Sequence, residues 1–282
     1  MCQMNIKTRF APSPTGNLHL GHAYAALFAE ANGNQFVLRI ENIDFRRCKP
    51  EFEKSIIDDL KWLGLRWQTP IRRQSDQMHK YSAALERLHK MELLYPCFCT
   101  RSDIQREIKN AGNAPHYKET GGHYPIYPQT CKRLNLVEKK KYLDSNVPFA
   151  LRMDMNAAIQ IAGKITWNDL NKGEQEAKPE SFGDIVIARK DIPTSYHLSV
   201  VVDDNDQNIN LVTRAHDLFS SSHVHRLLQA LLGYDLPNYL HHSIIKDDQG
   251  NQLSKRDKPV SLQDLKNNGA SPTQIRRRLG FE

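Results

Sequence analysis

The stretch Arg9-Phe-Ala-Pro-Ser-Pro-Thr-Gly-Asn-Leu-His-Leu-Gly-His22 decides the fold of this chain. Its two prolines and Gly16 favour a turn that neither a regular strand nor a helix would tolerate. Residues 6–11 before the turn predict a strand, and the alanine-rich residues 21–32 after it predict a helix. Because a helix N-terminus offers N–H donors and a positive dipole end, the arrangement predicts a phosphate site. The alternative is a proline-rich entry loop with two surface histidines.

Composition sets the broad class of the protein. The chain has 282 residues, 39% hydrophobic and 25% charged, which is typical of a soluble globular protein of one or two domains. A mean hydropathy of -0.61 and the absence of a long apolar run argue against a membrane span. Residues 1–7 lack the features of a signal peptide, so a cytoplasmic location is expected. A net charge of +7 favours phosphates, nucleotides or RNA as partners, although many basic proteins bind none of them.

Strands and helices alternate in two parts of the chain. After the opening strand and helix, the first part predicts a strand at 35–40 and helices at 51–63 and 81–94. The second part predicts strands at 185–188 and 209–213, an apolar element at 196–202 and a helix at 224–232. Carboxylates at the end of the strand at 35–40 lie where open α/β sheets bind ligands. This alternation predicts an α/β fold with a Rossmann-like, doubly wound parallel sheet.

The alternation stops between about residues 96 and 182, where strands are expected at 149–153 and 159–167. We interpret this region as an insertion between two halves of the sheet. The expected organisation is a first catalytic half at 1–95, the insertion at 96–182, a second half at 183–245 and a C-terminal segment at 246–282. That last segment carries two short predicted helices, at 261–266 and 272–279.

Three of the five cysteines, Cys97, Cys99 and Cys131, are grouped in the insertion. Three thiolates fit a tetrahedral Zn²⁺, but a structural zinc site requires a fourth ligand. The candidates for that ligand are His116, His123 and Tyr127. The alternative is a set of reduced cysteines without metal.

A second motif, Gln252-Leu-Ser-Lys-Arg256, follows the polar residues 247–250. A glycine-containing loop with Lys255 after Ser254 suits a phosphate clamp in which the ammonium acts as a point charge. A solvated basic turn is the more common meaning of such a run on its own. Its position near the opposite end of the chain from the first motif favours the clamp.

The two motifs, HLGH at 19–22 and QLSKR at 252–256, resemble in sequence and order the HIGH and KMSKS signatures of class I aminoacyl-tRNA synthetases. RFAPSPTGNLHLGH and LRIENID (38–44) are similar to the glutamyl/glutaminyl branch. SYHLSVVVDD (195–204) and LVTRAHDL (211–218) resemble the amino-acid pocket of that branch. The second motif has Leu253 where the family often has Met, and Arg256 in its last place.

The resemblance implies that His19, His22 and Lys255 are the catalytic residues. It implies an ATP site made of Pro12, Thr15, Gly16, His19, Gly21, His22, Ser254 and Lys255. It implies a glutamate site made of Arg9, Ala11, Ser13, Glu41, Tyr196 and Arg214. The α-carboxylate of glutamate would attack the α-phosphorus of ATP while Mg²⁺ bridges the phosphates, and positioning and charge stabilisation would supply the catalysis.

The types of residue suit this glutamate site. Arg9 and Arg214 can bind carboxylates bidentately, Glu41 can bind the ammonium, and Tyr196 adds a hydroxyl. Taken singly, each arginine could instead form a surface salt bridge. Three nearby acids could be loop residues or structural caps: Asp203, Asp204 and Asp217.

The CxC and YxxxC pattern over residues 97–131 resembles the zinc site of the glutamyl-Q tRNA(Asp) synthetases, which implies Tyr127 as the fourth ligand. The 26 residues after Arg256 (282 minus 256) also resemble this subfamily, which lacks the anticodon-binding domain of its relatives. Members activate glutamate without tRNA and transfer it to queuosine in the anticodon loop of tRNA(Asp). A monomer is expected. The alternatives are a synthetase core that charges a tRNA 3′ end, and a non-catalytic RNA-binding paralogue.

Overall fold

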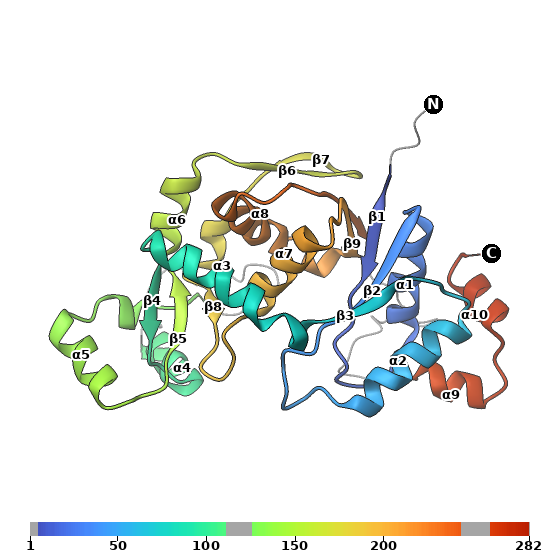
Figure 1. Ribbon diagram of the computed structural model, residues 1–282, viewed down its shortest axis with the longest axis horizontal. Coiled ribbons are helices and arrows are strands. Elements are labelled where there is room, and N and C mark those ends of the chain that lie inside the picture. The colour runs from blue at the N-terminus through green and yellow to red at the C-terminus, as the bar shows by residue number, and fades with distance from the viewer. Residues whose placement is uncertain (1–4, 111–125, 244–259, 282) are drawn as a thin grey trace.

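The structure, a computed structural model, describes residues 5–110, 126–243 and 260–281. Its described strands form three hydrogen-bonded sheets, spread from one side of the molecule to the other in Figure 1. Among these residues, no helix is both long and apolar enough to cross a membrane.

The first sheet contains the opening motif and is parallel, in the order β1-β2-β3. Its strands are β1 (Lys7–Phe10), β2 (Gln35–Ile40) and β3 (Gln68–Arg73). Its helices α1 (Leu20–Ala31) and α2 (Pro50–Trp62) lie beside the C-terminal helices α9 (Leu262–Asn267) and α10 (Pro272–Arg278) (Figure 1). Leu27, Leu38 and Leu60 share one core with Leu262 and Ile275, so apolar burial joins the two ends of the chain.

The second sheet has the order β7-β6-β10-β9, with β6, β10 and β9 parallel and β7 antiparallel. Its strands are β6 (Thr166–Asp169), β7 (Gly173–Glu176), β9 (Leu211–Ala215) and β10 (Asn238–His242). Four helices share one apolar core, and the last of them contacts β6: α3 (Met78–Lys90), α6 (Met155–Ala162), α7 (Tyr196–Asp206) and α8 (Ser221–Leu232). Helix α8 ends at Gly233, whose φ of 60° is the left-handed conformation that glycine adopts readily at a helix end.

The first two sheets meet where β1 lies beside β9. The amide of Lys7 donates to Oδ1 of Asn210 at 2.7 Å, and the amide of Asn210 donates to the carbonyl of Lys7 at 3.3 Å. Nη1 of Arg9 donates to the carbonyl of Thr213 at 3.0 Å, so the contact continues along the two strands. The carboxyl ends of strands from both sheets therefore converge at the ligand-binding edge of an α/β fold.

The third sheet is antiparallel and has the order β4-β5-β8. Its strands are β4 (Leu94–Cys97), β5 (Ala150–Met153) and β8 (Val186–Ala188). Helix α4 (Arg101–Asn110) lies below β4 and β5 in Figure 1, and helix α5 (Leu136–Asp144) lies at the left edge of the view. Four 3-10 helices complete the described elements: η1 (Gln74–Gln77), η2 (Thr130–Lys132), η3 (Pro179–Phe182) and η4 (His216–Leu218).

Three sequence predictions about the fold are corrected. The predicted α/β fold is confirmed, and the predicted parallel pairing holds for β1-β2-β3 and for β6, β10 and β9, but the strands are divided over three sheets, of which the second also contains the antiparallel β7 and the third is wholly antiparallel. The strand predicted at 159–167 is wrong, because Asp154 accepts from the amide of Ala157 and starts helix α6, and β6 begins only at Thr166. The helix predicted to Leu94 ends at Lys90, and the left-handed Glu92 (φ 57°) separates it from β4.

The division of the chain into four segments stays a prediction. Strands β6 and β7 fall within the expected insertion at 96–182, yet β6 pairs with β10 of the second sheet. Strand β8 falls outside it, yet pairs with β5 of the third sheet.

Candidate active site

The first motif places two imidazoles at the N-terminus of α1. His19 is the N-cap, and its Nδ1 accepts from the amide of Gly21 at 3.1 Å. Nδ1 of His22 accepts from the amide of His19 at 3.3 Å, which completes a reciprocal capping box. The two ring centroids are 3.8 Å apart. Because both Nδ1 atoms accept, each neutral ring carries its proton on Nε2. The helix end therefore combines backbone donors with two imidazoles.

The turn before α1 is held against the end of β2. The carbonyl of Pro12 accepts from the amide of Glu41 at 2.9 Å, and that of Pro14 accepts from Lys49 at 3.0 Å. Ser13 is exposed between them, while Ala11, Thr15 and Gly16 are half-buried. A Cβ atom on Gly16 would meet no protein atom within 4 Å, so packing alone does not require a glycine there. The turn thus presents an open backbone surface beside Glu41.

The second motif lies outside the described residues, so Ser254 and Lys255 have no described position. Ser261, six residues after Lys255, forms a β-bridge with His19. The amide of Leu262 also donates to the carbonyl of Leu18 at 2.8 Å. The chain that follows the second motif is therefore bonded directly to the first.

Arg9 and Glu41 belong to an ion-pair network, buried at its centre and partly exposed at Lys80 and Asp206, that we call the acidic network. Its members are Arg9, Arg39, Glu41, Arg72, Lys80, Asp203, Asp204 and Asp206. Nε of Arg9 donates to Asp204 at 3.0 Å, and Nη1 of Arg39 donates to the same carboxylate at 2.7 Å. Burial raises the pKa of Asp204, but Arg9 and Arg39 outweigh burial and hold that pKa below its usual value. Arg9 and Glu41, both predicted to bind glutamate, are therefore linked through Arg39 and Asp204.

Glu41 lies in this network 8% exposed, and Nη2 of Arg39 donates to it at 3.3 Å. Burial raises the pKa of Glu41 to about 7, and Arg39 and Arg9 act in the opposite direction. An incoming ammonium would favour the ionised form of this carboxyl group.

Arg214 has entirely different surroundings, which we call the histidine cradle: Arg214, Ser222, His225 and His241. Nε of Arg214 donates to Nε2 of His241 at 3.2 Å, and Nη1 lies 3.2 Å from Nδ1 of His225. Nη2 donates to the hydroxyl of Ser222. Desolvation and the charge of Arg214 lower the pKa of His241 to about 4 and the pKa of His225 well below its usual value, so both rings are neutral at pH 7. Within the described chain, no carboxylate forms an ion pair with this buried guanidinium.

Tyr196 stands where the two regions meet. Its ring centroid lies 5.6 Å from that of His225 in the cradle. Tyr196 is 36% exposed as a whole residue, but desolvation of its hydroxyl raises the pKa of that group, and the charges of Arg214, Glu41 and Arg9 also act on it. The structure therefore brings the predicted residues Arg9, Glu41, Tyr196 and Arg214 together at one edge of the fold.

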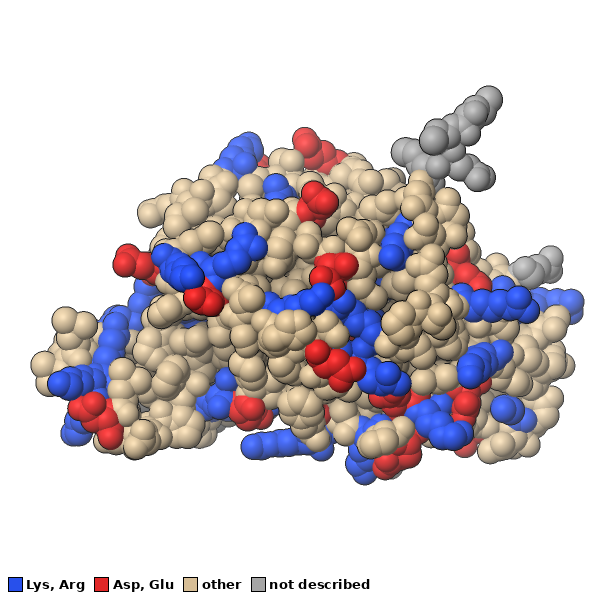
Figure 2. Space-filling view, in the orientation of Figure 1, with Lys and Arg blue, Asp and Glu red and all other residues tan. Residues whose placement is uncertain are grey.

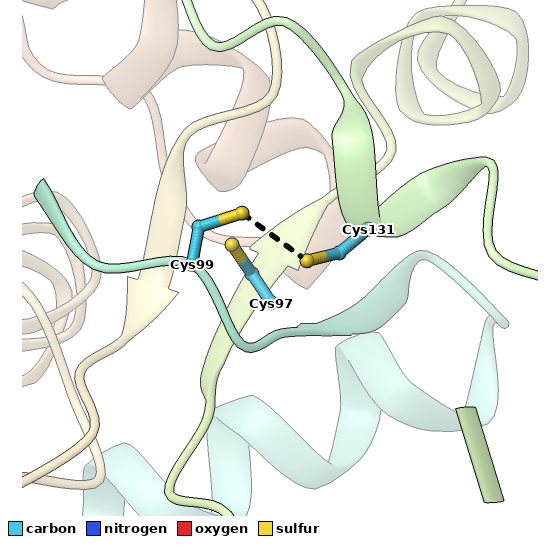
Figure 3. A group of neighbouring side chains, drawn as sticks. All are labelled: Cys97, Cys99 and Cys131. Carbon is cyan, nitrogen blue, oxygen red and sulfur yellow. Dashed lines mark hydrogen bonds between the residues drawn. The ribbon is translucent and has the colours of Figure 1, made fainter. Parts of the chain in front are cut away.

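The three grouped cysteines also converge (Figure 3). Their Sγ atoms all lie within 4.8 Å of one another, and Cys99 and Cys131 are 3.4 Å apart, too far for a disulfide. The buried hydroxyl of Tyr127 lies 3.4 Å from the sulfur of Cys97 and 3.6 Å from that of Cys99. Sulfur ligands about 2.3 Å from a tetrahedral zinc would be about 3.8 Å apart, so this donor set fits a zinc ion. His116 and His123 lie outside the described residues.

Sequence reasoning missed most partners of the two arginines. Arg39 was not singled out, although a charged residue inside the apolar strand Gln35–Ile40 was the available signal. Asp203 and Asp204 are buried network members on α7 rather than loop acids. Asp217 is exposed in η4. No sequence pattern predicts that His225 and His241 contact Arg214, because they lie on helix α8 and strand β10, which are brought together only by the fold.

Surface charge does not by itself locate a partner. In Figure 2, basic and acidic side chains are interspersed over the face shown.

The comparisons with known proteins agree with this fold. The family description "tRNA synthetases class I (E and Q), catalytic domain" matches residues 5–281. The chain belongs to this family of class I aminoacyl-tRNA synthetases, and it is an enzyme of the ligase type. More particularly, it is 44% identical over 283 residues to a glutamyl-Q tRNA(Asp) synthetase of Rhodobacter capsulatus, covering 97% of this chain and 99% of that relative.

Two further relatives define the similarity. A glutamyl-Q tRNA(Asp) synthetase of Nocardia farcinica is 36% identical, over 95% of this chain and 81% of the relative. The crystal structure of a glutamate tRNA ligase from Elizabethkingia meningosepticum, in complex with its amino acid, matches with a TM-score of 0.72 and 28% identity. That match covers 94% of this chain, which spans about half (53%) of the length of the ligase.

Proposed function

We propose that this enzyme activates glutamate with ATP in the absence of tRNA and then transfers the glutamyl group to queuosine in tRNA(Asp). The observation that carries the amino-acid assignment is Arg214, a buried cation without a carboxylate partner among the described residues. A buried cation is expensive unless a counter-charge compensates it, and the side-chain carboxylate of glutamate supplies that charge.

The remaining site residues complete the recognition of glutamate. Ionised Glu41 pairs with the substrate ammonium, and the hydroxyl of Tyr196 donates to a substrate oxygen. Arg9 uses three of its five N–H groups on Asp204 and Thr213, which leaves two for a carboxylate. Ala11 and Ser13 form the open wall of the site beside Glu41.

Activation needs little covalent help from the protein. A carboxylate oxygen of glutamate forms a bond to the α-phosphorus of ATP, and the bond to pyrophosphate breaks with its electron pair on the leaving group. His19 and His22 hold phosphate oxygens at the N-terminus of α1, with the turn from Pro12 to Gly16 and the backbone at Gly21 around the nucleotide. Ser254 and Lys255 clamp the phosphates. Mg²⁺, when bound, neutralises phosphate charge.

The acceptor assignment rests on the relatives. Two proteins named glutamyl-Q tRNA(Asp) synthetase are 44% and 36% identical to this chain over nearly its whole length. A hydroxyl of the queuosine cyclopentene diol would attack the carbonyl carbon of the adenylate, forming an ester and releasing AMP. We further propose that the enzyme acts as a cytoplasmic monomer.

We propose that the cysteine cluster holds one structural zinc ion through Cys97, Cys99, Tyr127 and Cys131. The support is the convergence of three sulfurs and a phenol oxygen that β4 and η2 bring together. Zinc would lower the thiol pKa values, including that of Cys99, which burial raises to about 12 without metal. Its role is to tie η2 to the third sheet.

Labelled pyrophosphate exchange tests the activation step. With glutamate and ATP alone, the enzyme is expected to exchange label into ATP. Exchange only in the presence of tRNA would favour a synthetase core that charges a 3′ end, and no exchange at all would favour a non-catalytic RNA-binding paralogue.

Mapping labelled glutamate on tRNA(Asp) tests the acceptor. Label is expected in the anticodon fragment, and only in tRNA that contains queuosine. Label at the 3′-terminal fragment would overturn the proposal. Fragment mapping is needed because periodate oxidises both the queuosine diol and the 3′-terminal diol.

Metal analysis tests the zinc site. The purified protein is expected to contain one zinc per chain, and Cys131→Ser to lose it. Cys48→Ser is the matched control, because Cys48 is a free cysteine outside the cluster. Absence of zinc from the unmodified protein after expression with added zinc would contradict the assignment.

A further inference from the structure

Arg214 is hydrogen-bonded to His241, which is in turn hydrogen-bonded to a carboxylate that has no role in the proposed reaction. Behind His241 lies Asp169, the last residue of β6, with Oδ2 at 2.6 Å from Nδ1 of the imidazole. Both members of this pair are almost completely buried. Asp169 belongs to a hairpin distant in sequence from the other members of the site, and the pairing of β6 with β10 brings it to His241.

Hydrogen-bond chemistry fixes the proton of His241. A guanidinium can only donate, so Nε2 of His241 accepts from Arg214. The proton of the neutral ring is therefore on Nδ1 and is donated to Asp169. The neutral imidazole therefore links Asp169 to Arg214 through two hydrogen bonds, and the carboxylate of Asp169 does not contact the guanidinium directly.

Asp169 is itself held in one orientation. Its Oδ1 accepts from the amides of Asn171 and Lys172, each at 3.0 Å, and its Oδ2 accepts from both the backbone and the ring of His241. The carboxylate cannot rotate without breaking these bonds. A fixed acceptor on Nδ1 therefore gives a fixed tautomer and ring orientation for His241.

We infer that Asp169 and His241 form a positioning pair that holds Arg214 in place as a cation directed at the substrate, and that this pair sets the preference for glutamate over glutamine. The inference rests on the proposed binding of glutamate by Arg214. A direct aspartate contact would compensate the guanidinium before substrate arrives, as Asp204 does for Arg9. Compensation through an imidazole stabilises the buried cation but leaves the guanidinium without an anion in direct contact. The side-chain carboxylate of glutamate supplies that anion, whereas the neutral amide of glutamine does not.

Asp169→Asn gives the sharpest test. Its amide oxygen would stay with the two backbone amides, so its NH₂ would face Nδ1 of His241. The ring would then have to accept at Nδ1 and carry its proton on Nε2, opposite the Nε–H of Arg214. Two donors would face each other, the same kind of tautomer error that inactivates a catalytic histidine when its aspartate becomes asparagine.

The expected result is a rise of about tenfold or more in the KM for glutamate in pyrophosphate exchange, with the KM for ATP unchanged. The ratio of kcat/KM for glutamate to that for glutamine should fall by a similar factor. His241→Gln should do less harm than His241→Leu, because its amide can donate to Asp169 and accept from Arg214 in the order that the imidazole does. A purely structural role would not produce this order or separate the two KM values.

Asp184→Asn is the matched control. Asp184 is also a buried carboxylate, and it accepts from the hydroxyl of Tyr95 at 2.7 Å and the amide of Met155 at 3.0 Å, outside the cradle. It should lower stability without raising the KM for glutamate.

Arg214→Leu separates the two proposals. If it leaves the KM for glutamate unchanged, the proposed glutamate site is wrong. If it raises that KM while Asp169→Asn does not, or if His241→Gln and His241→Leu are equally impaired, the positioning pair is overturned. The two His241 variants keep the test valid should Asp169→Asn fail to fold.

Discussion

Arg9 and Arg214 lie near the ends of neighbouring strands, and both are buried, but their surroundings differ in charge. Arg9 belongs to the acidic network, in which four basic side chains are paired with four acidic ones: Arg9, Arg39, Arg72 and Lys80 with Glu41, Asp203, Asp204 and Asp206. Around Arg214, the partners are a hydroxyl and two neutral imidazoles. The acidic network is internally compensated, whereas among the described residues the histidine cradle is compensated only through His241 and Asp169. This difference indicates that Arg9 mainly stabilises the structure and that Arg214 mainly binds the ligand.

The largest expected effects come from exchanging one arginine of each region for leucine. Arg39 is fully buried and contacts Glu41, Asp203 and Asp204. Arg39→Leu removes the ion-pair partner of Glu41 and leaves Asp204 with Arg9 and Asp203 with Arg72 alone, so the buried acids outnumber their cations. We expect it to lower the free energy of unfolding by about 3–5 kcal/mol, because breaking a buried ion pair strands the remaining charge. Arg214→Leu strands no contacting carboxylate and should lose clearly less stability. Urea denaturation of both variants measures the difference.

Equal losses of stability in the two variants would contradict the comparison. So would an Arg214→Leu protein that is less stable than Arg39→Leu yet binds glutamate normally. Both variants replace arginine by leucine at a buried site, so each serves as the control for the other.

The second prediction concerns the pH dependence of glutamate binding. Burial raises the pKa of Glu41 to about 7, so at pH 6 this group is mostly protonated and cannot pair with the substrate ammonium. The KM for glutamate should therefore fall as the pH rises from 6 to 8, by about tenfold for each unit below the pKa. Glu41→Gln should have a high KM that no longer follows this titration. A profile that is the same in both proteins would remove Glu41 from the ammonium site.

The same shift affects stability with a definite sign. The folded state binds a proton at Glu41 more tightly than the unfolded state, because the folded pKa of about 7 exceeds the ordinary value of 4.5. This contribution is complete below pH 4.5 and is lost as the pH rises through about 7. Glu41→Gln should therefore be stabilised relative to the unmodified protein at pH 8 more than at pH 5.

The local pattern of the sequence was enough to predict some parts of the molecule. Pro12, Pro14 and Gly16 with the alanines of α1 predicted a strand, turn and helix, because turn and helix signals are set by neighbouring residues. The Gly233 end of α8 was predicted for the same reason. The residues of the glutamate site came from motifs, and their convergence depends on how β1 and β9 pack.

Long-range pairing could not be predicted in this way. The apolar run from Ile159 favoured a strand, but the cap from Asp154 made part of it a helix. The separation into three sheets depends on which strand edges meet, a property of the whole chain. Asp169 and His241 are 72 residues apart, so neither predicts the other as a partner.

The smallest predicted effect tests whether burial organises the acidic network. Lys80 lies at its solvent-facing rim, with its side chain 34% exposed, and donates to Asp206 at 2.6 Å. Arg72 also bonds Asp206, so that carboxylate keeps a partner in Lys80→Ala. The variant should lose at most about 1 kcal/mol of unfolding free energy, a loss that shrinks in high salt, with an unchanged KM for glutamate. If Lys80→Ala were as destabilising as Arg39→Leu, charge balance rather than burial would control the network. The difference between the acidic network and the histidine cradle would then come from the number of charges in each region, not from the exposure of those charges to water.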